Sequence, residues 1–175
     1  YLKKAEAKEA QALIVVSNAS PLINVCKLHL FHYLPALYER LTIPEAVFNE
    51  VVEKGAGRPG AIEVSNGIKS RFILKKQVNN TLAVLALSEF FGSGESEAII
   101  LAAEISADAV ILDDNKARAV AASMNLHVTG TIGILLDLKS ADIIPKIRPY
   151  LNKAIRYGFR ISPVLYSKIL QKAKE

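Results

Sequence analysis

Residues 13–23 read LIVVSNASPLI, and this stretch predicts the first strand of an α/β sheet together with the helix that follows it. Leu13 to Val16 is a short apolar run rich in β-branched residues, which is typical of a buried strand. The polar segment SNASP ends that strand. We expect Pro21 to lie in the first turn of the next helix and Ser20 to cap it.

The same alternation of strand and helix continues along the chain. Apolar runs at 41–43, 72–74 and 109–112 predict further strands, and a shorter one begins at His127. Between and after these strands we expect helices at 34–40, 45–55, 81–91, 95–106, 115–125 and 131–141, followed by two polar helices after residue 144. Strands that are almost entirely apolar predict a parallel sheet with helices on both faces, so the expected class is α/β.

Length and composition predict one globular domain. The chain has 175 residues, of which 51% are hydrophobic and 22% charged, and we assign residues 13–175 to the domain. Residues 1–12 are charged and rich in alanine, so we expect an extension outside the fold. The single cysteine, Cys26, lies in an apolar stretch; it predicts a buried thiol and a reducing, cytoplasmic location. No segment resembles a secretory signal or a membrane span, so no membrane partner is expected.

Acidic residues, or an amide in place of one, follow the predicted strands or begin the helices. The positions are Asn18, Glu50, Glu95, Glu97, Asp113 and Asp114. In a parallel sheet, ligands bind beyond the carboxyl ends of the strands. Mg²⁺ and Mn²⁺ take oxygen ligands of this kind, and a cation offsets the repulsion between gathered carboxylates. The net charge of +5 also favours a polyanionic partner, so the pattern predicts a metal site on a basic protein.

Each of these residues has a simpler explanation when it is taken alone. Glu50 fits an ordinary solvated residue of a helix, and Glu95 fits a carboxylate that stabilises a helix N-terminus. One of Asp113 and Asp114 fits a helix cap. Their joint placement is what favours a metal site.

Other catalytic patterns are missing from the sequence. The chain contains no Walker loop, dinucleotide-binding fingerprint or nucleophile elbow. His29, His32 and His127 are spaced neither for a zinc site nor for a catalytic triad. One further hypothesis is a Mg²⁺-dependent phosphatase that uses the aspartates of VILDD. That chemistry requires an early nucleophilic aspartate, where this chain has Asn18.

The order of motifs resembles the PIN (PilT N-terminus) domain family, particularly its VapC-like prokaryotic branch. The motifs that carry the resemblance are VVSNASPLI, IPEAVFNE, GESEAI, VILDD with KAR, GTIGIL and GFRIS, and they span most of the chain from Leu13 onward. The resemblance implies a three-layer, Rossmann-like α/β/α sandwich with a central parallel sheet. It also implies Mg²⁺- or Mn²⁺-dependent cleavage of RNA, and many relatives are toxins that form homodimers and bind a small antitoxin protein.

Carried over motif by motif, the resemblance implies a set of site residues. Asn18 falls where the family has its first aspartate, and Glu50 falls on the second acidic position. For the third position we favour Glu97 over Glu95, and for the fourth Asp113 over Asp114. Ser20 and Thr131 match small hydroxyl residues near the site.

Asn18 departs from the family pattern, because an amide lacks the charge that an aspartate offers a cation. Two explanations remain open: a naturally degenerate site, or an aspartate replaced deliberately to silence a toxic nuclease. The leading hypothesis is therefore a PIN-type ribonuclease weakened or silenced at Asn18, and its rival is a degenerate domain that binds RNA or a protein without cutting. We also expect self-association, because one small sheet would leave Phe31, Tyr33 and Leu34 partly unburied.

Overall fold

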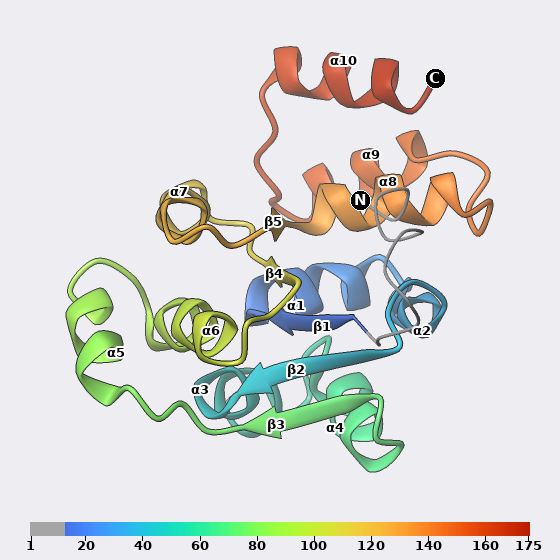
Figure 1. The fold of residues 1–175 in the computed structure, drawn as a ribbon. Coiled ribbons are helices and arrows are strands. Elements are labelled where there is room, and N and C mark those ends of the chain that lie inside the picture. Colours follow the sequence, from blue (N-terminus) through green and yellow to red (C-terminus); the bar gives the residue numbers. More distant parts are fainter. Residues whose placement is uncertain (1–12) are drawn as a thin grey trace.

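Five parallel strands form the centre of the protein. The computed structural model describes residues 13–175, and its sheet has the order β3-β2-β1-β4-β5 (Figure 1). The strands are β1 (Ile14–Ser17), β2 (Arg40–Pro44), β3 (Ile73–Lys76), β4 (Ala109–Ile111) and β5 (Val128–Thr129). Every neighbouring pair is parallel, with Val16 opposite Thr42 on one side and opposite Val110 on the other.

Helices cover both faces of the sheet because the strand residues are apolar on both sides. Val15 faces one core and Val16 faces the other, and both are almost completely buried. The first core contains residues of α1 (Ala19–Lys27), α2 (Leu34–Leu37), α3 (Glu45–Phe48), α4 (Ala61–Lys69), α8 (Thr131–Ser140), α9 (Arg148–Arg156) and α10 (Pro163–Lys172). The second contains residues of α6 (Ser93–Glu104) and α7 (Asn115–Ser123), with α5 (Thr81–Ser88) packed against α6. The architecture is therefore an α/β/α sandwich, as predicted.

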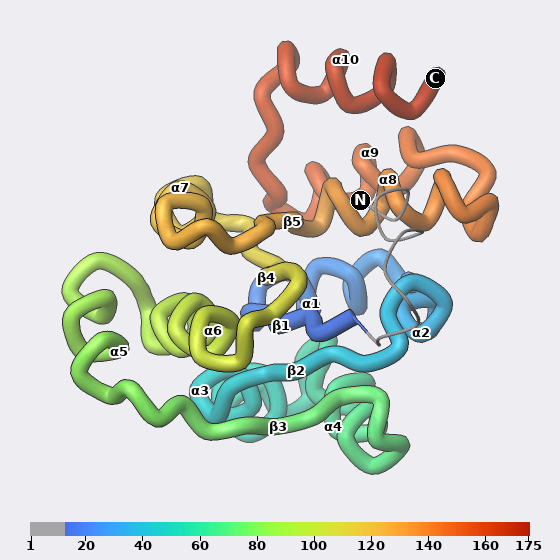
Figure 2. Tube along the Cα trace, viewed as in Figure 1, coloured from blue at the N-terminus to red at the C-terminus, as the bar shows by residue number. Residues whose placement is uncertain are grey.

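The last two helices lie on the outer side of α8, and α10 is the element farthest from the sheet in Figures 1 and 2. Glu175 joins this region, because its carboxylate accepts hydrogen bonds from Lys139 Nζ at 2.7 Å and from the backbone N–H of Ile147 at 2.6 Å. Leu151 and Leu170 bury the inner faces of the two helices. The two helices predicted as polar are therefore amphipathic and belong to the main core.

Several predicted boundaries differ from the structure. Asn18, rather than Ser20, caps α1, because the helix begins one residue before Ser20. The helix predicted at 34–40 ends at Leu37, since Arg40 already belongs to β2. Residues 1–12, predicted as an extension, lie outside the described residues.

The residues predicted to remain partly unburied are confirmed in two cases and wrong in one. Phe31 and Tyr33 are partly buried and pack against the first core, whereas Leu34 is fully buried inside it. The most exposed apolar side chains lie on and after α5, where Leu82 and Phe90 are 79% and 77% exposed. Others lie on α4 and α10, where Ile62 and Val164 are 70% and 67% exposed.

Candidate functional site

The candidate site lies where β1 and β4 end. The backbone N–H of Asn18 donates to the carbonyl of Ile111 at 3.1 Å, so the ladder between these strands continues one residue past β1. The chain passes from β1 towards β2 and β3 on one side, and β4 and β5 occupy the other (Figure 1). This reversal of strand order is the position at which open α/β sheets bind ligands.

Asn18 uses both ends of its side-chain amide. Its Oδ1 accepts from the backbone N–H of Ala19 at 2.6 Å, which caps α1, and its Nδ2 donates to Oε1 of Glu95 at 2.9 Å. The residue is only 2% exposed. A neutral amide therefore links the end of β1 to the first turn of α6.

Glycine allows this part of α6 to lie against the other site residues. A Cβ on Gly94 would stand 2.9 Å from Oδ1 of Asn18 and 3.1 Å from Oε2 of Glu50. Both distances are too short for an unstrained contact, so a larger residue would push the two side chains away. The side-chain oxygens of Asn18 and Glu50 thus border the same point beside Gly94.

Glu50 reaches this point from an unusual turn. Pro44 ends β2 and begins α3, which then widens into a π-helical turn over Asn49–Glu53. Turns of this type are frequent at functional sites because the extra residue redirects a side chain. Partial desolvation raises the pKa of the Glu50 carboxyl, and the nearby charge of Glu95 raises it further, while Lys54 acts in the opposite direction. Glu50 and Glu95 therefore interact as like charges.

Glu97 contacts the first turn of α3. Its Oε2 accepts a hydrogen bond from the backbone N–H of Ala46 at 2.9 Å, so the side chain satisfies a donor in the first turn of α3. Glu95, one of the two glutamates left open by the sequence, is the one that contacts Asn18. The sequence analysis favoured Glu97 as the third site residue, but in the structure Glu95 is the glutamate that is hydrogen-bonded to Asn18. The two side chains lie on different sides of one helix because they are two residues apart.

Asp113 lies in a separate hydrogen-bonded group. Its carboxylate accepts from the backbone N–H of Thr131 at 2.7 Å, from the Thr131 hydroxyl at 2.6 Å and from Nδ2 of Asn24 at 2.9 Å. These bonds join the end of β4 to α1 and α8. Asp114 caps α7 by accepting from the backbone N–H groups of Lys116 and Ala117, as one of the two aspartates was expected to do.

The remaining predicted residue, Ser20, lies half-buried in the first turn of α1. The sequence analysis missed Asn24, Gly94 and Arg118. Arg118 donates through Nη1 to the carbonyls of Leu112 and Thr129 at 2.8 and 2.7 Å and so ties the ends of β4 and β5 together. A glycine two residues into the GSGESEA helix start was the one available signal for close packing.

Two carboxylates and one amide therefore make up the site. Within residues 13–175, no group of three or more His, Cys, Asp or Glu side chains lies close enough together to hold a metal ion. Mg²⁺ is commonly bound through only one or two carboxylates, with water and substrate phosphate as its other ligands. The paired Glu50 and Glu95 fit that requirement, since their mutual repulsion favours a bound cation.

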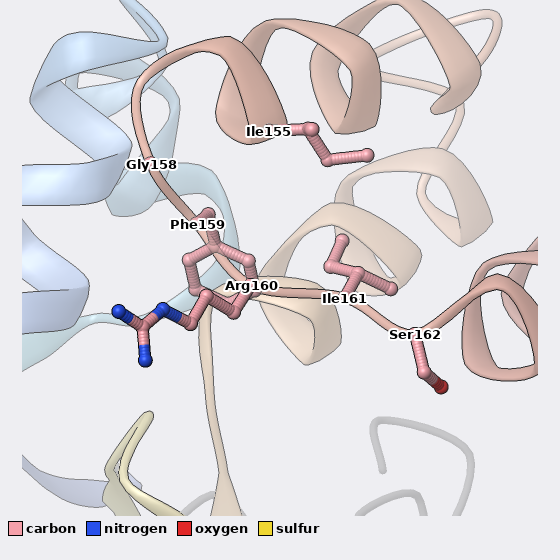
Figure 3. Close-up of a pocket in the computed structure, with 6 residues that line it drawn as sticks. All are labelled: Ile155, Gly158, Phe159, Arg160, Ile161 and Ser162. Carbon is pink, nitrogen blue, oxygen red and sulfur yellow. The ribbon is translucent and has the colours of Figure 1, made fainter.

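Two other features lie apart from this site. Cys26 is buried, so the prediction of a buried thiol is confirmed, and burial together with the charge of Glu63 raises the pKa of that thiol to about 12. A surface hollow follows α9 and is lined by Ile155, Gly158, Phe159, Arg160, Ile161 and Ser162 (Figure 3). It contains none of the carboxylates described above.

Comparison with known proteins assigns the family. A family model described as a PIN domain matches residues 14–175, and the chain belongs to the PIN-domain family. PIN domains are generally nucleases, so the broad functional class is that of a nuclease.

Other comparisons add little. The chain is similar to a PilT N-terminus domain protein from the hyperthermophilic archaeon Sulfolobus solfataricus P2, with 18% identity and a TM-score of 0.38 over 68% of this chain and 87% of that one. No curated protein matches the chain. Among the helices of residues 13–175, none is long and apolar enough to cross a bilayer.

Proposed function

We propose that the protein is a metal-dependent endoribonuclease whose metal site consists of Glu50 and Glu95. The observation that carries this proposal is the convergence of these two carboxylates beside Asn18 and Gly94 at the end of the central strand. Two like charges brought together in a folded protein cost free energy unless a cation offsets them. A PIN-family fold and a net charge of +5 are consistent with RNA as the polyanionic substrate.

The chemistry of the reaction would be hydrolysis of a phosphodiester by in-line attack of water. A bound Mg²⁺ or Mn²⁺ ion supplies positive charge that favours deprotonation of water and offsets charge on the phosphoryl oxygens. Glu50 and Glu95 would hold the ion. Glu50, the more exposed of the two and the one with the raised pKa, would also accept a proton from the attacking water.

Two cationic side chains, Lys54 beside Glu50 and Lys75 at the end of β3, would bind the RNA backbone. Lys54 lies near enough to Glu50 to oppose the rise in its pKa. Lys75, at the carboxyl end of β3, pairs with Glu45 at 2.9 Å and lies 4.4 Å from the centre of the Phe48 ring. Such exposed cations attract phosphate groups while the acidic pair attracts the metal.

A second candidate function is an RNA- or protein-binding module without catalysis. The hydrogen bond from Asn18 to Glu95 favours it, because a neutral donor already stabilises one carboxylate where an aspartate would require a cation. The two candidates predict different responses to metal.

We also propose that the protein acts as the toxin of a toxin–antitoxin pair, that it is cytoplasmic and that it forms a homodimer. Dimer formation is best supported at α5, where Leu82, Leu85 and Phe90 are 64–79% exposed. An apolar surface of this kind commonly marks a protein interface. A small antitoxin protein is the alternative partner that we propose for this exposed surface.

The experiment that tests the nuclease is cleavage of a mixed RNA substrate in the presence of Mn²⁺. We expect Asn18→Asp to raise cleavage, because the added negative charge attracts the cation more than the lost hydrogen bond to Glu95 weakens its binding. Glu50→Gln in that background should remove the activity again. Glu97→Gln is the matched control, since Glu97 bonds to Ala46 rather than to Asn18. If the aspartate variant binds Mn²⁺ and cuts no RNA or single-stranded DNA, the binding-module function is favoured.

A further inference from the structure

Position 18 has a function of its own in this chain, different from that of the aspartate it replaces. We propose that Asn18 is a positioning residue for Glu95 and not a metal ligand. This inference rests on the proposed metal site and concerns how its carboxylates are arranged.

The amide oxygen of Asn18 is enclosed by protein atoms. Oδ1 of Asn18 accepts from the N–H of Ala19 at 2.6 Å and faces the α-carbon of Gly94, where even a Cβ would come within 2.9 Å. The residue is 2% exposed, so a hydrated ion has no open approach to this oxygen. The oxygen is committed to capping α1.

The amide nitrogen of Asn18, Nδ2, points at Glu95 and donates to its Oε1 at 2.9 Å. A nitrogen that carries two hydrogens cannot coordinate a cation, but it can hold a carboxylate in one orientation. The opposite orientation of the amide would place Nδ2 against the N–H of Ala19, donor against donor, so the hydrogen bonds fix which atom faces Glu95.

Asn18 and Glu95 therefore have different roles: Asn18 orients the carboxylate, and Glu95 binds the ion. One oxygen of Glu95, Oε1, is held by Asn18, and the other, Oε2, lies beside Gly92, while the carboxylate as a whole remains close enough to raise the pKa of Glu50. Asn18 acts on the metal only through Glu95. Its loss should therefore weaken metal binding only while Glu95 is a carboxylate.

A double-mutant cycle tests this dependence. Asn18→Ser retains a good N-cap for α1 but is too short to reach Glu95, so it separates capping from positioning. Free Mn²⁺ is measured by electron paramagnetic resonance in titrations of the protein, Asn18→Ser, Glu95→Gln and the double variant. Removal of an outer residue that orients a ligand typically weakens metal binding by about 10–100-fold. We expect a loss in that range for Asn18→Ser and no further loss when it is added to Glu95→Gln.

Equal losses in both backgrounds would overturn the proposal, because they would mean that Asn18 contacts the ion itself. A measurement without metal makes the test independent of the nuclease. The side-chain NH₂ protons of Asn18 should exchange slowly with solvent in the parent protein, and markedly faster in Glu95→Ala. Unchanged exchange would also overturn the positioning function. Absence of Mn²⁺ binding in the parent, with slow exchange retained, would instead overturn the proposed metal site alone.

Discussion

Replacement of Asn18 by aspartate should destabilise the protein when no metal is present. The substitution is nearly isosteric, and aspartate caps a helix as well as asparagine does, so α1 should be unaffected. The change falls on the contact with Glu95, where an N–H donor at 2.9 Å becomes a second carboxylate oxygen. A hydrogen bond is thereby exchanged for a repulsion.

The lost hydrogen bond and the new charge repulsion can each be given an approximate energy. A hydrogen bond to a charged group contributes about 1.5–3 kcal/mol. Two unit charges about 4 Å apart repel by roughly 1 kcal/mol in water and roughly 4 kcal/mol at the effective dielectric constant of a protein surface. Uptake of a proton by one carboxylate will relieve part of this. We therefore expect a loss of about 3–5 kcal/mol in the free energy of unfolding at neutral pH.

Thermal unfolding followed by circular dichroism measures the effect. For a domain of this size, each kcal/mol lowers Tm by about 2–4 °C, so the aspartate variant should unfold at least about 6 °C lower in EDTA. Excess Mn²⁺ should raise the Tm of Asn18→Asp more than that of the parent, because the ion binds the native state and offsets the new charge.

A reciprocal variant is the control. Asn18→Asp combined with Glu95→Gln exchanges the donor and the acceptor, so the stability in EDTA should return towards that of the parent. Its Tm should respond little to Mn²⁺. If Asn18→Asp alone is as stable as the parent in EDTA, or if the reciprocal variant restores no stability, then the contact between Asn18 and Glu95 does not stabilise the fold in this way.

Three further outcomes are expected. Glu50→Gln should stabilise the metal-free protein slightly near pH 7, because a carboxyl whose pKa is raised by folding costs stability above its unfolded pKa. The gain should fall away in denaturation experiments as the pH drops through the unfolded pKa of about 4.3, since the carboxyl is then protonated in both states. Cys26 should react with a thiol reagent at the rate of unfolding rather than at that of a free thiol, since its pKa is about 12; rapid labelling of the native protein would contradict its buried position. Leu85→Lys with Phe90→Lys should abolish any dimer seen by light scattering, and an unchanged mass would exclude α5 as the interface.

Much of the fold could be predicted from apolar patterning. The runs that end at Val16 and Leu112 lie on β1 and β4, and the parallel class followed from their lack of alternation. The N-cap of α1 was predicted at Ser20 because serine is as good an N-cap as asparagine. The backbone conformation in the structure shows that the cap is Asn18.

The site residues were harder to predict from the sequence than the fold, because neighbouring residues on one helix point in different directions. Glu95 and Glu97 are equivalent in composition, and their separation depends on the orientation of α6 over β1 and β2. The three donors to Asp113 come from Asn24 and Thr131, which lie 89 and 18 residues away in the chain. Such contacts have no local signal.

Binding of Mn²⁺ to the protein, to Glu50→Gln, to Glu95→Gln and to Glu97→Gln, measured by electron paramagnetic resonance at neutral pH, tests the proposed metal site itself. We expect one ion per chain in the parent and a large loss of affinity in the Glu50 and Glu95 variants. Glu97→Gln should bind the ion as the parent does, because its carboxylate serves Ala46 in α3. Full affinity in either Glu50→Gln or Glu95→Gln, or a loss confined to Glu97→Gln, would contradict the assignment of the site.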